Sequence, residues 1–221
     1  MRIWELDAWR SLALCFMIFF HILVDLRDLF LYPIDYQQGF WRFTGVFAAV
    51  SFILLAGVSS TLSRSALRHG LRILLAAAAV SAGTWWWDAD TYVRFGILHL
   101  LGVSLLTAPL LHRLPLAFVA ALAAGTAALP AFLPAFASTP WLLPFGVTPP
   151  VFTTLDYYPL FPWYGLFTAG HLAGRVLYPE RRSLLPQPPG SSRFLWLGRH
   201  TLAIYLLHQP LLVALLTLLH K

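Results

Sequence analysis

Five ionisable residues fall in or beside one apolar stretch near the start of the chain: Asp7, Arg10, His21, Asp25 and Asp28. At about 100° per residue, Arg10 and Asp28 each project within about 20° of His21 on a helix, and Asp25 lies one turn beyond it. These residues form one polar stripe, which must face protein or water rather than lipid. A carboxylate beside a histidine is the usual way to orient an imidazole as a base. The sequence therefore predicts a catalytic His21 oriented by Asp25, with a purely structural pair that locks two helices together as the alternative.

The position of Arg10 on the same stripe suggests what this helix could bind. Arg10 and His21 are about 16 Å apart along a helix axis. With Arg10 at the inner membrane edge, His21 lies past the middle of a hydrocarbon core about 30 Å thick. An arginine within reach of cytosolic phosphates and a histidine deep in the membrane suit the two ends of an elongated donor molecule.

Other polar residues occur at comparable depths in later apolar runs. The segment RFGILHLLGVS places polar groups at an outer helix end, and GRHTLAIYLLHQP carries Thr201, Tyr205 and His208 on one face. His171 lies among small residues, where a hydrogen bond between helices is at least as good an explanation as chemistry. No helix carries histidines and a carboxylate with zinc-like spacing, so we expect no metal site. The candidate substrate-binding residues are Asp28, Arg94, His99, Trp163, Tyr205 and His208.

The elements that must position these residues are membrane helices. Apolar residues make up 59% of the 221 residues and charged residues only 11%, and the mean hydropathy is +0.71. A soluble domain could not bury so much apolar surface, and a disordered chain would not contain it. The single cysteine, Cys15, excludes an internal disulfide framework. The sequence thus predicts an all-α integral membrane protein.

Seven apolar runs are candidate crossings and form a single domain over residues 1–221. They cover residues 8–29, 41–63, 70–86, 95–111, 115–136, 158–178 and 194–220. All of the 15 basic residues except Lys221 are arginine, and they gather at the ends of these runs. This distribution indicates membrane topology rather than a nucleic-acid partner. We expect a multi-pass protein of the plasma (inner) membrane.

Arginine bias predicts the orientation of this helical bundle. With the N-terminus inside and the C-terminus outside, eleven basic residues lie inside and four outside, which follows the positive-inside rule. The inner residues are Arg2, Arg10, Arg64, Arg68, Arg72, Arg113, Arg175, Arg181, Arg182, Arg193 and Arg199. The outer residues are Arg27, Arg42, Arg94 and Lys221.

Several segments resemble a known family of membrane enzymes. The spacing of Arg10 and His21 in ELDAWRSLALCFMIFFH is similar to the first-helix motif of membrane acyltransferases that modify sugars and envelope polymers. The segments FHILVDL, RFGILHLLGVS, DYYPLFPWYGLF and GRHTLAIYLLHQP resemble, more narrowly, bacterial relatives of the heparan-alpha-glucosaminide N-acetyltransferase catalytic domain. The resemblance runs from Glu5 to about Leu212 and keeps the order of the family's segments.

The resemblance implies transfer of an acyl group, by preference acetyl, from cytosolic acyl-CoA to an amine or hydroxyl of an extracytoplasmic sugar or glycolipid. It implies a catalytic role for His21 and a contact between Arg10 and donor phosphates. The lysosomal relatives have asparagine near the position of His21 and use a histidine in the following outer loop, whereas the loop RDLFLYPIDYQQGF has none. Five more arginines are candidate contacts for CoA phosphates, and the alternative is that they serve membrane topology alone. They are Arg64, Arg68, Arg72, Arg175 and Arg199.

Two other functions fit parts of the same pattern. An intramembrane histidine and carboxylate also suit the proton relay of a proton-coupled small-molecule transporter, although the chain shows no inverted repeat. A non-catalytic membrane assembly protein could keep the same fold. The expected partners are the lipid bilayer, acyl-CoA and the acceptor, and no nucleic acid. The sequence leaves the oligomeric state open, a homodimer included.

Overall fold

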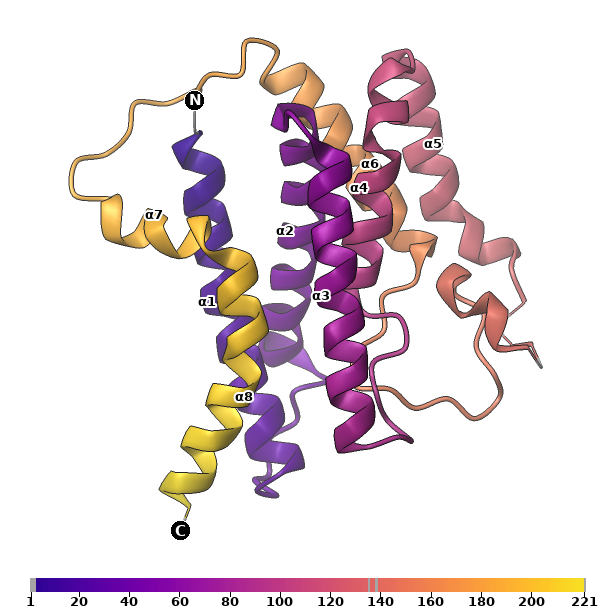
Figure 1. Cartoon of the computed structure of the whole chain (residues 1–221), viewed down its shortest axis with the longest axis vertical. Helices are drawn as coiled ribbons and strands as arrows, with labels where there is room; N and C mark the ends of the chain where they lie inside the picture. The colour runs from indigo at the N-terminus through magenta and orange to yellow at the C-terminus, as the bar shows by residue number, and fades with distance from the viewer. Residues whose placement is uncertain (1–2, 135, 138, 221) are drawn as a thin grey trace. The chain divides into compact units, whose positions relative to one another are not determined.

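The computed structural model describes residues 3–134, 136–137 and 139–220, and its regular elements are helices (Figure 1). Arg2 and Lys221, which enter the count of basic residues, lie outside these residues. Extended pairing in the described part is limited to two isolated bridges, Phe95–Tyr157 and Phe136–Thr148. The elements are α1 (Trp4–Asp28), α2 (Gly39–Leu62), α3 (Ala66–Trp87), α4 (Ile97–Arg113), α5 (Leu116–Ala128), η1 (Leu129–Phe132), η2 (Pro140–Phe145), α6 (Leu160–Leu177), α7 (Ser192–Arg199) and α8 (Thr201–Leu219).

Three helices among the described residues, α1, α2 and α8, are long and apolar enough to cross a membrane. Their most apolar windows have mean hydropathies of 1.7, 2.0 and 2.0. The helix α4 and the run Leu116–Phe132 are shorter and also apolar. The chain is therefore an all-helical membrane protein, and the seven crossings with their orientation stay predictions of the sequence.

Two of the expected runs are interrupted in the structure. The run 115–136 forms α5, which ends at Ala128, and the 3-10 turn η1, whose second residue is Pro130. Proline cannot donate to the helical hydrogen-bond ladder, so the α-helix ends there. The run 194–220 divides at His200 into the short helix α7 and the longer helix α8.

The division near His200 has a cause on another helix. The Ser11 hydroxyl of α1 donates to the carbonyl of Phe194 at 2.5 Å and accepts the N–H of Gly198 at 2.8 Å. Those two backbone groups would otherwise bond to each other within α7. A side chain that enters the ladder in this way weakens helical continuity. Ser11 therefore ties α7 to α1 where the last helical run breaks.

The contacts of the chain fall into two compact units, and the boundary lies inside α2. The first unit comprises residues 1–52 and 180–221. In this unit α1 packs against α7 and α8 (Figure 1), and the Trp9 indole donates to the Ser51 hydroxyl of α2 at 3.0 Å. Because Ser11 contacts α7 and Tyr32 contacts His220, α1 and α8 run in the same direction. This parallel pairing is what an N-inside, C-outside chain requires of its first and last helices.

The second unit, residues 53–179, is built around close helix contacts. Here α3 packs on α4, α5 on α6, and α4 on α6. Small residues let the end of α2 approach α6: a Cβ on Gly57 would overlap the carbonyl oxygen of Phe167, and one on Gly170 would overlap that of Leu54. Such small-residue contacts are typical of helices that pack in membranes.

We predict that Gly57→Ala destabilises the protein, because the added methyl group meets backbone atoms that cannot rotate away. Overpacking of this kind costs about 1–3 kcal/mol. The matched control is Gly83→Ala on α3, where nothing lies within 4 Å of the added Cβ and alanine favours the helix by up to about 1 kcal/mol. Thermal unfolding in detergent compares the two, and equal unfolding temperatures would contradict the close approach of α2 and α6.

Candidate functional site

Two histidines from the first and last helices meet in the first unit. The ring of His21 on α1 and the ring of His208 on α8 lie with their centroids 4.8 Å apart, edge to face. His208 is 8% exposed. The ring of Tyr205, one turn earlier on α8, lies 5.5 Å from that of His208. The structure thus brings His21 together with His208, which the sequence assigned to substrate binding, and Tyr205 lies next to His208.

Asp25 is bonded to α8 rather than to His21. Its Oδ1 accepts a hydrogen bond from the Gln209 side-chain amide at 2.6 Å, and the carboxylate is only 3% exposed. Among the described residues, no hydrogen bond joins Asp25 to His21. Sequence reasoning missed Gln209, although a glutamine beside His208 in an apolar helix is itself a signal of an interhelical contact.

The seam between α1 and α8 contains three buried polar atoms without a hydrogen-bond partner in the described structure. They are Oδ2 of Asp25, Oε1 of Gln209 and Nε2 of His208. Most buried polar atoms in proteins have a hydrogen-bond partner, so three unpartnered atoms on neighbouring side chains need an explanation. A polar ligand or water bound in the seam would satisfy them.

At the other end of α1, two arginines share one carboxylate. Arg10 donates to Oδ1 of Asp7 at 2.7 Å, and Nε of Arg199 lies 3.4 Å from Oδ2 of the same side chain. The Asp7 side chain is 8% exposed, and those of Arg10 and Arg199 are 25% and 31% exposed. The cluster carries one net positive charge and keeps both guanidinium groups partly accessible. It therefore retains the capacity to bind an anion.

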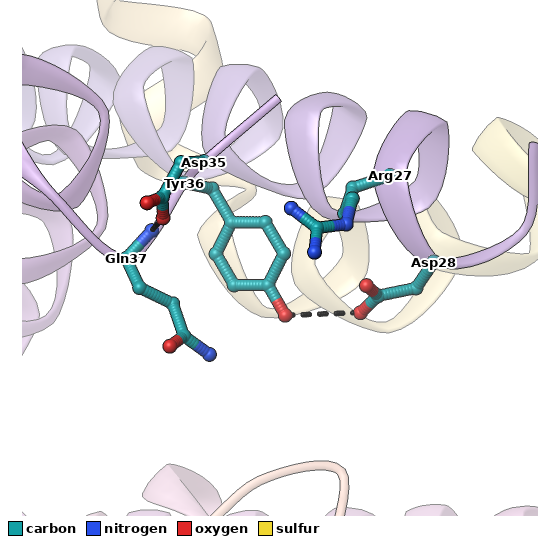
Figure 2. A pocket seen from close by; sticks show the side chains of 5 residues that line it. All are labelled: Arg27, Asp28, Asp35, Tyr36 and Gln37. Atoms are coloured by element: carbon teal, nitrogen blue, oxygen red, sulfur yellow. Dashed lines mark hydrogen bonds between the residues drawn. The ribbon is translucent and has the colours of Figure 1, made fainter. Parts of the chain in front are cut away.

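Beyond the histidine pair, the C-terminal end of α1 forms a polar pocket of about 270 Å³ (Figure 2). The Tyr36 hydroxyl donates to Oδ2 of Asp28 at 3.0 Å, and Arg27 donates to the carbonyl of Ile34 at 2.7 Å. Asp28 is two turns, about 10 Å, beyond His21 on the same helix face. Sequence reasoning singled out only Asp28 here. The lining residues are Arg27, Asp28, Asp35, Tyr36 and Gln37.

In the second unit, the loop before α4 pairs with the loop before α6. The N–H groups of Leu155 and Tyr158 donate to the carbonyls of Thr91 and Phe95 at 2.8 and 3.0 Å. The Arg94 guanidinium lies over the rings of Tyr92 and Phe152, at 5.1 and 5.5 Å. Arg94, which the sequence assigned to substrate binding, thus belongs to an aromatic and cationic cluster within its own unit.

The other expected contacts of the second unit are divided between structural and exposed positions. Arg175 donates to the carbonyls of Leu111 and Leu114 at 3.3 and 2.7 Å, so it caps the end of α4. Nδ1 of His99 accepts the N–H of Gly96 at 3.2 Å, and the Trp163 ring lies 5.0 Å from that of Tyr158. The remaining candidate arginines are exposed and lie in the connection after α2 and on α3: Arg64, Arg68 and Arg72.

His171 is a structural histidine of the second unit. It is fully buried, and its Nδ1 lies 2.7 Å from the Ser60 hydroxyl of α2. That hydroxyl also donates to the carbonyl of Gly57 at 2.6 Å. The contact ties α6 to α2 at the glycine approach, which agrees with the interhelical interpretation of the sequence.

Asp156 links the paired loops to the start of α4. Its Oδ2 accepts the N–H of Ile97 at 2.8 Å, and Gly96 leaves room for the carboxyl group because a Cβ there would overlap it. Burial raises the pKa of Asp156 from 3.8 to about 6, and the hydrogen bond from Ile97 opposes part of that rise. The folded chain therefore holds a proton on Asp156 between about pH 4 and 6 that the unfolded chain has released.

We predict that the stability of the protein falls as pH rises from 4 to 7, in part because Asp156 loses this proton in the folded state. Asp156→Asn accepts the same hydrogen bond without a charge, so it should be more stable than the wild type at pH 7, by on the order of 1–3 kcal/mol, and similar to it at pH 4. Thermal unfolding across this range measures the difference. The exposed Asp90→Asn serves as control, and a difference between Asp156→Asn and the wild type that does not vary with pH would refute the assignment.

Comparison with known proteins agrees with these features. No curated protein and no solved structure matches the chain. The family model described as heparan-alpha-glucosaminide N-acetyltransferase, catalytic, matches residues 2–210, which include the histidine pair and the arginines around Asp7. This span is nearly the whole chain of 221 residues. The protein belongs to the heparan-alpha-glucosaminide N-acetyltransferase catalytic family.

Proposed function

We propose that the protein is a membrane acyltransferase that moves an acyl group, by preference acetyl, from cytosolic acyl-CoA to an amine or hydroxyl of an extracytoplasmic sugar or glycoconjugate. The observation that carries the proposal is the contact between the half-buried His21 and the buried His208, with unpartnered polar atoms on the same pair of helices. The family supports an acetyltransferase. The acyl donor and the acceptor are our inference from the groups along α1.

The donor phosphates would bind at the cluster around Asp7. Arg10 and Arg199 keep accessible guanidinium groups, and a guanidinium binds phosphate in bidentate fashion. From Arg10 to His21 is about 16 Å along α1, so an elongated donor that lies along the helix would bring its thioester to the histidines. Arg10 and Arg199 are thus the donor-binding residues of the proposal.

The transfer itself would take place at His21. The imidazole either takes the proton of the acceptor as it attacks the thioester carbonyl or first accepts the acyl group itself. Asp25 does not contact the reacting atoms in this scheme. Its hydrogen bond to Gln209 holds α8, and with it His208, against α1. Asp25 is therefore a positioning residue.

The acceptor would approach from the pocket at the end of α1. Its lining offers carboxylate, guanidinium, phenol and amide groups, which together can donate and accept the hydrogen bonds of a hydroxyl-rich molecule. The charges of Arg27, Asp28 and Asp35 sum to minus one, which disfavours an anionic acceptor at this point. A sugar that is neutral or carries an amine fits the pocket best.

We predict that His21→Ala abolishes acyl transfer while the protein stays folded, because it removes the reacting imidazole from a half-buried position. The assay measures CoA release from acetyl-CoA in the presence of a panel of amino sugars and glycolipids, with His69→Ala, at an exposed position on α3, as control. Acetyl-CoA should raise the unfolding temperature of the wild type, since a ligand that binds only the folded state stabilises it. Wild-type turnover in a folded His21→Ala protein would refute the mechanism, and no turnover of the wild type with any acceptor would refute the function.

A second prediction separates donor binding from membrane topology at Arg10. Arg10→Lys keeps a cation beside Asp7 and satisfies the positive-inside rule, but it replaces a planar fork by a point charge. Loss of a charge-assisted contact of about 1.5–3 kcal/mol should raise the KM for acetyl-CoA about 10- to 100-fold and change the acceptor KM far less. Steady-state kinetics against Arg42→Lys, an exposed control on α2, checks this. An unchanged donor KM would make Arg10 a topological anchor.

A further inference from the structure

The protons on His208 can be assigned from its contacts. Nδ1 of His208 lies 2.5 Å from the carbonyl oxygen of Tyr205 on the same helix. A carbonyl oxygen can only accept, so Nδ1 must carry the hydrogen. The ring is buried, and no anionic side chain bonds to it among the described residues, so it is neutral. Its other nitrogen, Nε2, therefore holds a free lone pair.

Two other unpartnered atoms of this helix pair are also hydrogen-bond acceptors. Nε2 of His208, Oε1 of Gln209 and Oδ2 of Asp25 are all hydrogen-bond acceptors, all buried, and all without a partner in the described structure. Three acceptors on adjoining side chains have no donor among themselves to satisfy them. The seam is therefore complementary to a molecule that brings N–H or O–H groups.

We propose that His208 is a second catalytic residue, which takes the proton of the acceptor while His21 carries the acyl group. The proposal rests on the acyltransferase function above and selects between the two roles left open for His21. It assigns His208 to proton transfer rather than to substrate binding alone. The basis is the free Nε2 of a neutral ring in contact with the ring of His21.

The two steps balance without any further reactant. In the first, a ring nitrogen of His21 attacks the thioester carbonyl, the carbon–sulfur bond breaks, and the ring proton of His21 passes to the sulfur to give free CoA. In the second, the amine or hydroxyl attacks the acyl carbon, the bond from that carbon to His21 breaks, and the proton of the acceptor moves to Nε2 of His208. Transfer of a proton from His208 back to His21 restores both rings.

The test is His208→Gln, because glutamine keeps a hydrogen-bonding group but cannot take up the proton. With acetyl-CoA and acceptor, this variant should release one CoA per chain in a rapid burst and then turn over slowly, and intact-protein mass should show one acyl group that is absent in His21→Ala. Loss of a general base lowers turnover by about 10²- to 10⁴-fold. The exposed His69→Gln on α3 is the matched control, and equal unfolding temperatures of the three proteins show that folding is unaffected.

The outcomes separate this inference from the function on which it rests. Turnover of His208→Gln at the wild-type rate, in a protein whose His21→Ala variant is inactive, would overturn the role of His208 and leave the acyltransferase function standing. Failure of His208→Gln to release even the first CoA would overturn the division of roles. Absence of CoA release by the wild type would instead overturn the function itself.

Discussion

The hydrogen bond between Asp25 and Gln209 is the interaction on which the site depends. Only 6% of the residues in the most apolar window of α8 are buried, whereas 56% of the residues in the corresponding window of α2 are buried. Apolar contact therefore does little to fix the position of α8, because lipid is as good a neighbour for its leucines as another helix. A carboxylate in an apolar seam sets the register instead, since an unpaired partner would cost about 1.5–3 kcal/mol or more. This register places His208 against His21.

Polar groups also fix the other end of this helix pair, where α7 meets the first half of α1. The Ser11 hydroxyl replaces a backbone bond of α7, and Gly198 lets the two backbones come into contact, since a Cβ there would overlap the carbonyl of Asp7. The last helical run thus becomes two helices anchored to α1 at separate points. Each anchor is polar, and each lies beside a group with a proposed chemical role.

Much of the fold could be predicted from the sequence. Long apolar runs predict membrane helices, and the helical period predicts which polar residues share one face. The family was also evident from short segments, and the family match confirms it. The partner of Asp25 could not be predicted, since Gln209 lies 184 residues away and periodicity relates only residues of one helix. The break at His200 could not be predicted either, because it is caused by Ser11, which lies on another helix far away in the sequence. The pocket depends on a loop in which Leu31 adopts a positive φ of 60°, which no pattern in that segment indicates.

The carboxylate that Arg10 and Arg199 share has a consequence for selectivity. Any anion that approaches either guanidinium must compete with Asp7, which is tethered to the same cluster and always present. A small, singly charged anion gains little from displacing it, because one contact is exchanged for another. A ligand with several phosphates can engage both arginines at once and outweigh the loss. In the proposed donor site, an internal counter-ion of this kind would therefore favour polyanions over the abundant simple anions of a cell.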